Sequence, residues 1–157
     1  MQEQTIIRLA RPGDIDTLMP LYREHLNAAN PDLPVDDRVH AHWQSILDNP
    51  MLHYFVAEVD GLVVATCNLT IVPNLTYNLS PYAVIENVVT HADYRRRGLG
   101  RMLMETAIST AWEAGCHKVM LMSGAGRTEA HRFYESLGFD GDSKKGFSMR
   151  RTVPLPG

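Results

Sequence analysis

Hydrophobic and polar residues follow patterns along the chain that predict alternating strands and helices. Strands are predicted where short apolar or alternating runs stand between turn residues, and helices where apolar residues recur at every third or fourth position. The predicted strands are Thr5–Ala10, Leu52–Val59, Leu62–Val72, Tyr82–Thr90, Cys116–Met122 and Phe147–Val153. The predicted helices run from the N-cap Asp14 to about Asn27, from Asp36 or Asp37 to just before Asn49, from Gly98 to Ala114 and from Arg127 to Leu137.

Turn residues separate these elements and set their order. Asp60-Gly61 is a strong signal for a two-residue hairpin between two strands. The predicted loops are Asn30–Pro34, Pro73–Pro81 and Ser123–Gly126. The order β-α-α-β-β-β-α-β-α-β predicts an α/β (α+β) fold with a mixed sheet and helices on both faces. Because no linker interrupts the pattern, we expect a single domain over residues 1–157.

The segment from Gly98 to Ala114 carries the clearest helical pattern in the chain. Its apolar side is formed by Leu103, Met104, Ala107, Ile108 and Ala111. Charged and polar residues follow one another at four-residue steps on the opposite side, and Gly115 stands where a left-handed residue ends many helices. The segment is therefore predicted to pack one face on the sheet.

Composition narrows the class of protein. The chain has 157 residues, of which 45% are hydrophobic and 21% charged, which is ordinary for an ordered globular protein. Its net charge of −3 argues against a nucleic-acid-binding protein, and no apolar run is long enough to span a membrane. Cys67 and Cys116 lie in apolar stretches and are predicted to be buried free thiols, as in a reducing compartment. Because Met1–Arg11 also does not resemble a secretory signal, we expect a cytoplasmic protein. His40 and His42 do not share a helix face, and no metal site is expected.

An arginine- and glycine-rich turn joins an apolar strand to the clearest helix. It contains Arg95-x-x-Gly98-x-Gly100, and three consecutive arginines precede the first glycine. Backbone N–H groups at a helix start favour a phosphate group, and glycines let the backbone approach it closely. A solvated basic loop that caps the helix explains the same residues equally well. Leu103 stands where a dinucleotide-binding motif needs its third glycine, which argues against that class.

Three segments together resemble a known family. Arg95-x-x-Gly98-x-Gly100 resembles the acetyl-CoA signature of the GCN5-related N-acetyltransferase (GNAT) family. Ala130–Phe139 is similar to the second family motif, and Ile7–Asp14 is similar to the usual family opening. The resemblance implies the GNAT fold, with a mostly antiparallel central sheet and acetyl-CoA bound where two parallel strands diverge.

The resemblance also implies which residues hold the cofactor. Backbone groups of the strand end pair with the pantetheine arm, and amides of Arg96–Arg101 hold the pyrophosphate. The implied cofactor-binding residues are Val88, Val89, Thr90, Arg95, Arg96, Arg97, Gly98, Leu99, Gly100, Arg101 and Arg127. Arg127 stands where family members often carry Asn, and it could instead meet a phosphate.

Two residues are candidates for the chemistry of acetyl transfer. Glu86 lies within an apolar strand, where burial would make it a stronger base, although a structural carboxylate paired with an arginine is equally consistent. The resemblance implies that Tyr134 is the acid that protonates the leaving thiolate; without the resemblance, a packing role is favoured. Family analogy also suggests walls for the acceptor amine, namely Tyr22, His25, Trp43 and Tyr82.

The resemblance implies an N-acetyltransferase that moves acetyl from acetyl-CoA to a primary amine of a small molecule. Direct transfer in a ternary complex is expected, because neither cysteine lies in a motif. Acetylation of a protein N-terminus or lysine is an alternative within the class. An acyl-CoA-binding sensor without turnover, or a phosphate-binding interaction module that uses Arg95–Arg97, are alternatives from other classes. A homodimer is possible by family analogy.

Overall fold

The computed structural model describes residues 2–26 and 33–152. The chain divides into two compact units, Met1–Leu121 and Met122–Gly157, and each is described by itself. The expectation of one domain over the whole chain stays a prediction. Within the described ranges, no helix has the length and apolar character needed to cross a membrane.

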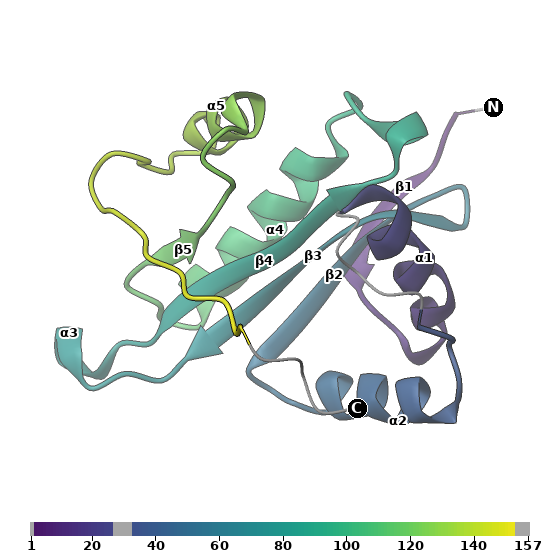
Figure 1. Cartoon of the computed structure of the whole chain (residues 1–157), viewed down its shortest axis with the longest axis horizontal. Coiled ribbons are helices and arrows are strands. Elements are labelled where there is room, and N and C mark those ends of the chain that lie inside the picture. Colours follow the sequence, from purple (N-terminus) through teal and green to yellow (C-terminus); the bar gives the residue numbers. More distant parts are fainter. Residues whose placement is uncertain (1, 27–32, 153–157) are drawn as a thin grey trace. The chain divides into compact units, whose positions relative to one another are not determined.

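The first unit contains a five-stranded sheet whose strands lie side by side in chain order (Figure 1). The strands are β1 (Thr5–Leu9), β2 (Leu52–Val59), β3 (Leu62–Val72), β4 (Tyr82–Thr90) and β5 (Val119–Leu121). Strands β1 to β4 are antiparallel, and β5 runs parallel to β4. At the β2–β3 hairpin, Asp60 and Gly61 have φ angles of 47° and 84°, as the predicted two-residue turn requires. The mixed, mostly antiparallel sheet is confirmed.

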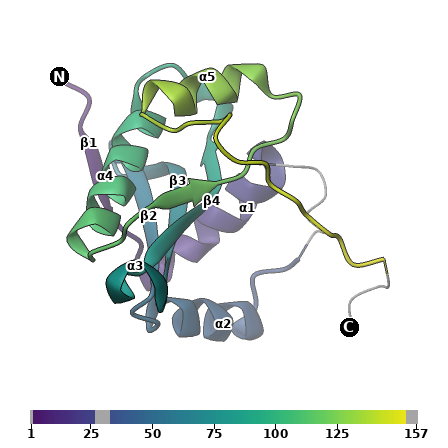
Figure 2. The same cartoon turned by 90° about the vertical axis from the view of Figure 1, so that its left-hand side faces the viewer.

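Helices cover both faces of this sheet. They are α1 (Ile15–His25), α2 (Asp37–Leu47) and α4 (Leu99–Glu113), with short 3-10 turns η1 (Pro12–Asp14) and η2 (Ala92–Tyr94). The four-residue turn α3 (Thr76–Leu79) lies in the connection between β3 and β4 and contains left-handed residues. Figure 2 shows α4 and α1 on opposite sides of the strands. Helix α2 begins as predicted, because the Asp36 carboxylate accepts a hydrogen bond from the Val39 amide at 3.1 Å. Helix α1 ends at His25; its predicted end at Asn27, and residues 30–32 of the predicted loop, lie outside the described residues.

The core forms two layers because neighbouring residues of each strand point to opposite faces. Under α1 and α2, Val56 joins an apolar cluster with Leu18 and Trp43. On the other face, the predicted apolar side of α4 is buried except for the half-buried Ile108, and the Cys67 thiol lies 3.9 Å from the Leu103 carbonyl oxygen. Strand β3 is covered on both faces, which explains why its sequence is almost continuously apolar.

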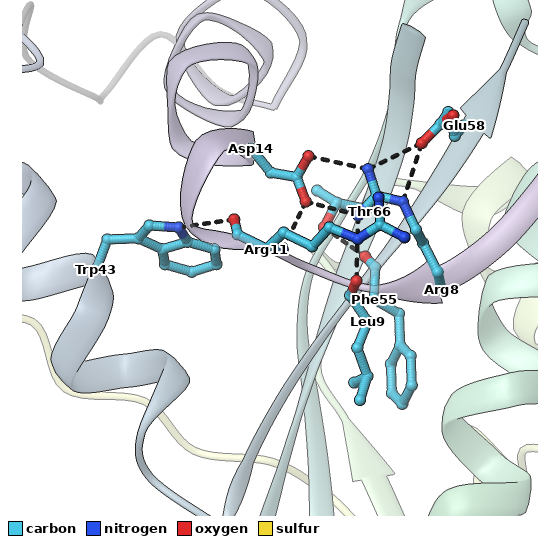
Figure 3. Close-up of polar contacts among 8 residues, drawn as sticks. All are labelled: Arg8, Leu9, Arg11, Asp14, Trp43, Phe55, Glu58 and Thr66. Carbon is cyan, nitrogen blue, oxygen red and sulfur yellow. Dashed lines mark hydrogen bonds and ion pairs between the residues drawn. The ribbon is translucent and has the colours of Figure 1, made fainter. Parts of the chain in front are cut away.

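A cluster of paired charges fixes the start of the chain to the sheet (Figure 3). The Arg8 guanidinium contacts the Asp14 carboxylate at 2.7 and 3.0 Å and Glu58 at 2.9 Å. The predicted cap Asp14 lies before α1, but its carboxylate accepts from the Arg11 amide at 2.7 Å and serves the η1 turn instead. The Trp43 indole N–H donates to the Arg11 carbonyl at 3.2 Å, which ties α2 to the same turn.

Strand β5 is shorter than the predicted Cys116–Met122. Before β5, the His117 amide donates to the Pro81 carbonyl and the Ala83 amide donates to the Lys118 carbonyl, each as a single bond. Regular parallel pairing then joins Ala83–Ile85 to Val119–Leu121. Strand β5 therefore begins at the residue where continuous backbone pairing with β4 replaces single hydrogen bonds.

The second unit contains α5 (Thr128–Ser136), which Gly138 closes with a φ of 103° as predicted. The predicted strand Phe147–Val153 is wrong over residues 147–152, where the backbone forms no strand, and Val153 lies outside the described residues. Phe147 and Met149 are exposed. A strand needs a ladder partner, and residues 122–152 of this unit include no other strand.

Candidate active site

The second half of β4 has an unpaired edge. Strand β5 pairs with β4 only along Ala83–Ile85, so within the described chain the stretch Glu86–Thr90 has no ladder partner on that side (Figure 1). A strand edge of this kind presents free N–H and C=O groups that can bind an extended ligand as an additional strand. The predicted pantetheine contacts Val88, Val89 and Thr90 lie in this stretch.

A β-bulge redirects β4 at the start of this edge. Asn68 of β3 pairs with Glu86, and Thr66 pairs with Val89, so two residues of β4 oppose the single residue Cys67. Asn87 occupies the left-handed region with a φ of 53°. Val89, which follows the bulge, points into the core under α1. Ile85, which precedes the bulge, is also buried but points to the opposite face of the sheet. No sequence pattern signalled this bulge.

The arginine turn is held by its own side chains. Arg95 Nε donates to the Thr90 carbonyl at 3.2 Å, and Arg97 pairs with Glu3 at 3.0 Å and donates to the Asp93 carbonyl at 3.1 Å. The Arg97 guanidinium also lies 4.8 Å from the centre of the Tyr94 ring. These contacts order the backbone between β4 and α4 and concentrate positive charge beside it.

The turn leads into α4 through glycine. Gly98 is the N-cap with a φ of 80°, and it offers no side chain to cap the helix. The Met102 amide donates to the Gly98 carbonyl at 3.1 Å and closes the first turn. The amides of Leu99, Gly100 and Arg101 therefore belong to the set that a helix cannot satisfy internally, and the helix dipole adds positive potential there. This geometry suits a phosphate group.

Glu86 is exposed, so the burial expected for it is wrong. The almost continuously apolar sequence of β4 suggested an interior strand, but pairing with β5 ends at Ile85, which leaves Glu86 beside the open edge. Across the strands, Glu86 is the register partner of Asn68, and Asn68 is the partner of Tyr54. Cross-strand partners share one face, so these three polar side chains form a row on the face that also carries α1 and α2.

Sequence reasoning missed Asn68 and Tyr54. The signal was available, because Asn68 is the one amide side chain inside the apolar run Leu62–Val72. Asn68 is 9% exposed, and its Oδ1 atom has no hydrogen-bond partner among the described residues. Burial raises the pKa of Tyr54, and hydrogen bonding with Asn68 opposes that shift.

The four suggested acceptor walls have different surroundings. Burial raises the pKa of Tyr22 on α1, and hydrogen bonding with Thr66 opposes that shift in part. The His25 ring packs on His91 with centroids 4.2 Å apart. Trp43 is a core residue that packs edge-on against Tyr54 at 5.1 Å. The fourth, Tyr82, is covered by Lys118, whose Nζ lies 5.5 Å from its ring centre.

Neither cysteine has the surroundings of a nucleophile. Both are free and buried, as predicted. Burial raises the pKa of Cys67 to about 12 and also raises the pKa of Cys116. At neutral pH a thiol of this kind has almost no thiolate, the form that attacks an acyl group.

The two remaining predicted site residues lie on α5 in the second unit. Arg127 is the exposed N-cap, and its amide donates to the Gly124 carbonyl at 3.0 Å. The Tyr134 ring is half-buried and packs edge-on against Phe139 at 6.2 Å. His131 on the same helix bonds the Gly124 carbonyl through its ring nitrogen at 2.8 Å. The roles predicted for Arg127 and Tyr134 stay predictions.

Comparisons with known proteins agree with this geometry. Residues 15–139 match the model of the acetyltransferase (GNAT) family. A solved structure from Agrobacterium tumefaciens str. C58, provisionally named an acetyltransferase, is 45% identical with a TM-score of 0.87, covering 93% of this chain and 99% of that one. An aminoglycoside N-acetyltransferase in complex with CoA is 19% identical and shares the fold, with a TM-score of 0.79 and 98% coverage of both chains.

The curated relatives are matched over shorter stretches. Glucosamine 6-phosphate N-acetyltransferase from Trypanosoma brucei brucei is 34% identical over 54% of this chain and 56% of its own length. The first two curated relatives are covered over 48% and 56%, so this chain spans about half the length of each. The family model matches well over half of the chain, and the chain therefore belongs to the GNAT family of acetyltransferases.

Proposed function

We propose that this protein transfers acetyl from acetyl-CoA to the primary amine of a small molecule, directly and within a ternary complex. One observation carries the proposal: the unpaired edge of β4 at Glu86–Thr90 leads through the arginine turn into the uncapped start of α4. An extended arm that ends in a pyrophosphate needs both features, in this order. The backbone of Val88–Thr90 binds the arm, amides of Arg96–Arg101 bind the pyrophosphate, and Arg127 meets a phosphate.

The chemistry assigns one proton to each candidate residue. Glu86 takes a proton from the acceptor ammonium, so that the nitrogen lone pair can attack the thioester carbonyl. A new C–N bond forms, the C–S bond breaks, and Tyr134 gives its phenolic proton to the leaving thiolate, while the second proton of the attacking nitrogen returns to the Tyr134 phenolate. The exposure of Glu86 supports this role, because an acceptor can reach it from solvent. The buried cysteines support direct transfer over an acetyl-cysteine intermediate.

A small acceptor is supported by the relatives. Glucosamine 6-phosphate and aminoglycosides, named in the matched proteins, are both small polar amines. The polar row Tyr54–Asn68–Glu86 on the face of α1 and α2 provides hydrogen-bonding groups for such a molecule.

The experiment is thermal unfolding with and without acetyl-CoA, followed by thiol release with a panel of amines and one alanine-initiated peptide. Ligand at 100 times its Kd adds about 2.7 kcal/mol, which raises the melting midpoint by roughly 5–10 °C for a chain of this size. Gly100→Leu should abolish this rise, and Gly13→Leu, in open space on the η1 turn, is the matched control. No rise in the wild type at millimolar acetyl-CoA would refute the proposal.

Two variants separate an enzyme from an acyl-CoA sensor. Glu86→Gln and Tyr134→Phe should keep the rise in melting temperature but lower thiol release, because each removes a proton-transferring group and leaves the backbone contacts proposed for the pantetheine arm and the pyrophosphate in place. A sensor would show the same rise in wild type and variants and no thiol release with any amine. Acetylation of the peptide, with no acetylation of any small amine, would indicate that the substrate is a protein.

A further inference from the structure

The row formed by Tyr54, Asn68 and Glu86 crosses three neighbouring strands, β2, β3 and β4. The pairings Tyr54–Asn68 and Asn68–Glu86 are direct register partners, before the bulge begins. Their side chains therefore project from the same face and are neighbours across the strands. Exposure changes along the row: Tyr54 is half-buried beside Trp43, Asn68 is 9% exposed, and Glu86 is exposed. A molecule that approaches Glu86 meets Asn68 as the next polar group inward.

Asn68 has an unmet hydrogen-bonding group. Its Oδ1 atom is buried and without a partner within the described residues. Native proteins pair nearly all buried polar atoms, because an unpaired one costs folding free energy. A structural role accounts for the hydrogen bonding between Asn68 and Tyr54 but not for the unpaired Oδ1 atom.

Thr66, two residues earlier on the same face of β3, is a buried polar residue whose hydrogen bonding can be compared with that of Asn68. Its hydroxyl is fully buried and donates to the Phe55 carbonyl at 2.7 Å. The strand thus satisfies Thr66 internally but leaves Asn68 Oδ1 open. The difference between these two neighbours points to a ligand that supplies a hydrogen-bond donor at Asn68.

The chemistry of the open atom limits the ligand. A carboxamide oxygen accepts hydrogen bonds, so its partner carries N–H or O–H. An acyl-CoA has donors in the amides and hydroxyl of its pantetheine arm, but that arm is proposed to lie along Val88–Thr90, beyond the bulge from Asn68. The neighbouring Glu86 adds a negative charge on the same face, which favours a cation. An amine with a second donor fits both groups, and cross-strand neighbours are about 5 Å apart, which is the reach of a three-carbon chain.

We propose that Asn68 is a specificity-determining residue, whose Oδ1 binds a hydroxyl or second amino group three carbons from the nitrogen that is acetylated. This inference deepens the proposed function and rests on it. Hydrogen bonding between Asn68 and Tyr54 lowers the pKa of Tyr54, whereas Asn68 Oδ1 has no partner among the described residues. The acceptor class is thus amino alcohols and diamines, including the amino sugars that contain the same unit.

The test compares 3-amino-1-propanol with n-butylamine, which differ by a hydroxyl in place of a methyl group. The wild type should favour the amino alcohol in kcat/KM by about tenfold, or about 1.4 kcal/mol. Asn68→Leu should reduce the ratio to near one by raising KM for the amino alcohol, with kcat little changed. Asn68→Asp keeps an acceptor oxygen and should retain the preference. Thr66→Val is the matched control and should also retain it.

A second readout does not depend on turnover. In a ¹⁵N-resolved spectrum, titration with 3-amino-1-propanol should shift the side-chain amide signal of Asn68, and n-butylamine should not. An unchanged ratio in Asn68→Leu, with no shift of the amide signal, would mean that Oδ1 is met by a buried water and would overturn the inference. If acetyl transfer occurs on every amine without discrimination, the subsite fails and the proposed function stands. If no amine is acetylated and no signal shifts, both fail.

Discussion

Two polar clusters on the first unit differ in how their buried groups are paired. Around Arg8, each carboxylate has a close partner: Asp14 and Glu58 both contact the guanidinium at 3.0 Å or less, and Asp14 also accepts from a backbone amide. In the row of Tyr54, Asn68 and Glu86, one buried oxygen is unpaired and the carboxylate is exposed.

The difference separates residues that hold the fold from residues that meet a ligand. Charged groups are tolerated away from water only when partners replace the lost hydration, and the Arg8 cluster meets that condition. In the row, the charged residue Glu86 stays in water and the buried Asn68 Oδ1 has no partner among the described residues, and the row lies beside the open edge of β4. Substitutions should therefore have opposite effects in the two places: large on stability in the cluster, and large on function but small on stability in the row.

The largest effect is expected for Arg8→Met. The variant leaves Asp14 and Glu58 without their cation, with only 11% and 19% of their side chains exposed. Loss of one partner of a buried pair costs about 3–5 kcal/mol, and we expect about 2–4 kcal/mol here because water still reaches the edge of the cluster. Urea unfolding measures this cost. Arg23→Met removes an exposed ion pair with Glu24 and should change the free energy of unfolding by less than about 0.5 kcal/mol. Equal effects of the two variants would contradict the comparison.

The same cluster should make stability depend on acid. Burial acts to raise the pKa of Asp14, but hydrogen bonds from Arg8 and the Arg11 amide hold it below the ordinary value of 3.8. A carboxyl with a depressed pKa stabilises the fold above its unfolded value, and the stabilisation is lost as pH falls through the folded value.

Asp14→Asn should therefore lower the free energy of unfolding at pH 7 by about 1–2 kcal/mol. The gap to the wild type should shrink below pH 3.8. Asp16→Asn, at an exposed residue in the first turn of α1, is the control and should show a much smaller gap. A gap that stays constant from pH 7 to pH 3 would remove Asp14 from the acid response.

Local patterns sufficed for most of the fold. The Asp60-Gly61 turn set the β2–β3 register, and the apolar side of α4 identified the face that packs on the sheet. The predicted strand Phe147–Val153 failed because a pattern shows what could pair and not whether a partner strand is present. The same residues would form a strand beside any suitable edge.

The site was predictable where it depends on a local sequence and not where it depends on neighbours. The glycines and arginines between β4 and α4 identified a phosphate-binding turn, because a helix start is a local feature. Glu86 lies at an open edge because the pairing between β4 and β5 ends at Ile85, and the pairing of the Asn68 side chain depends on residues of the two neighbouring strands. Neither property belongs to any single segment of the sequence.

A smaller effect is expected for Thr66→Val, which tests the paired group inside the row's own strand. The variant keeps the shape of the side chain but removes the hydrogen bond to the Phe55 carbonyl. The expected cost is about 1 kcal/mol in the free energy of unfolding, with acceptor preference unchanged. Thr70→Val, half-buried further along β3, is the matched control and should cost less. A change in acceptor preference for Thr66→Val would place the ligand deeper under α1 than proposed.

The smallest effect on stability, and the sharpest contrast with Arg8, is expected for Asn68→Leu. Replacing the amide removes an unpaired buried oxygen, which favours the variant, but also removes the hydrogen bond between Asn68 and Tyr54, which disfavours it. These contributions have similar size, so the free energy of unfolding should stay the same or rise by up to about 1 kcal/mol. Asn68→Ala, which leaves a cavity instead, should lower it. The midpoints of urea unfolding, compared at equal m-values, distinguish the wild type, Asn68→Leu and Asn68→Ala. A loss for Asn68→Leu as large as that for Asn68→Ala would mean that the amide is a structural partner like Arg8, and the distinction between the two clusters would fail.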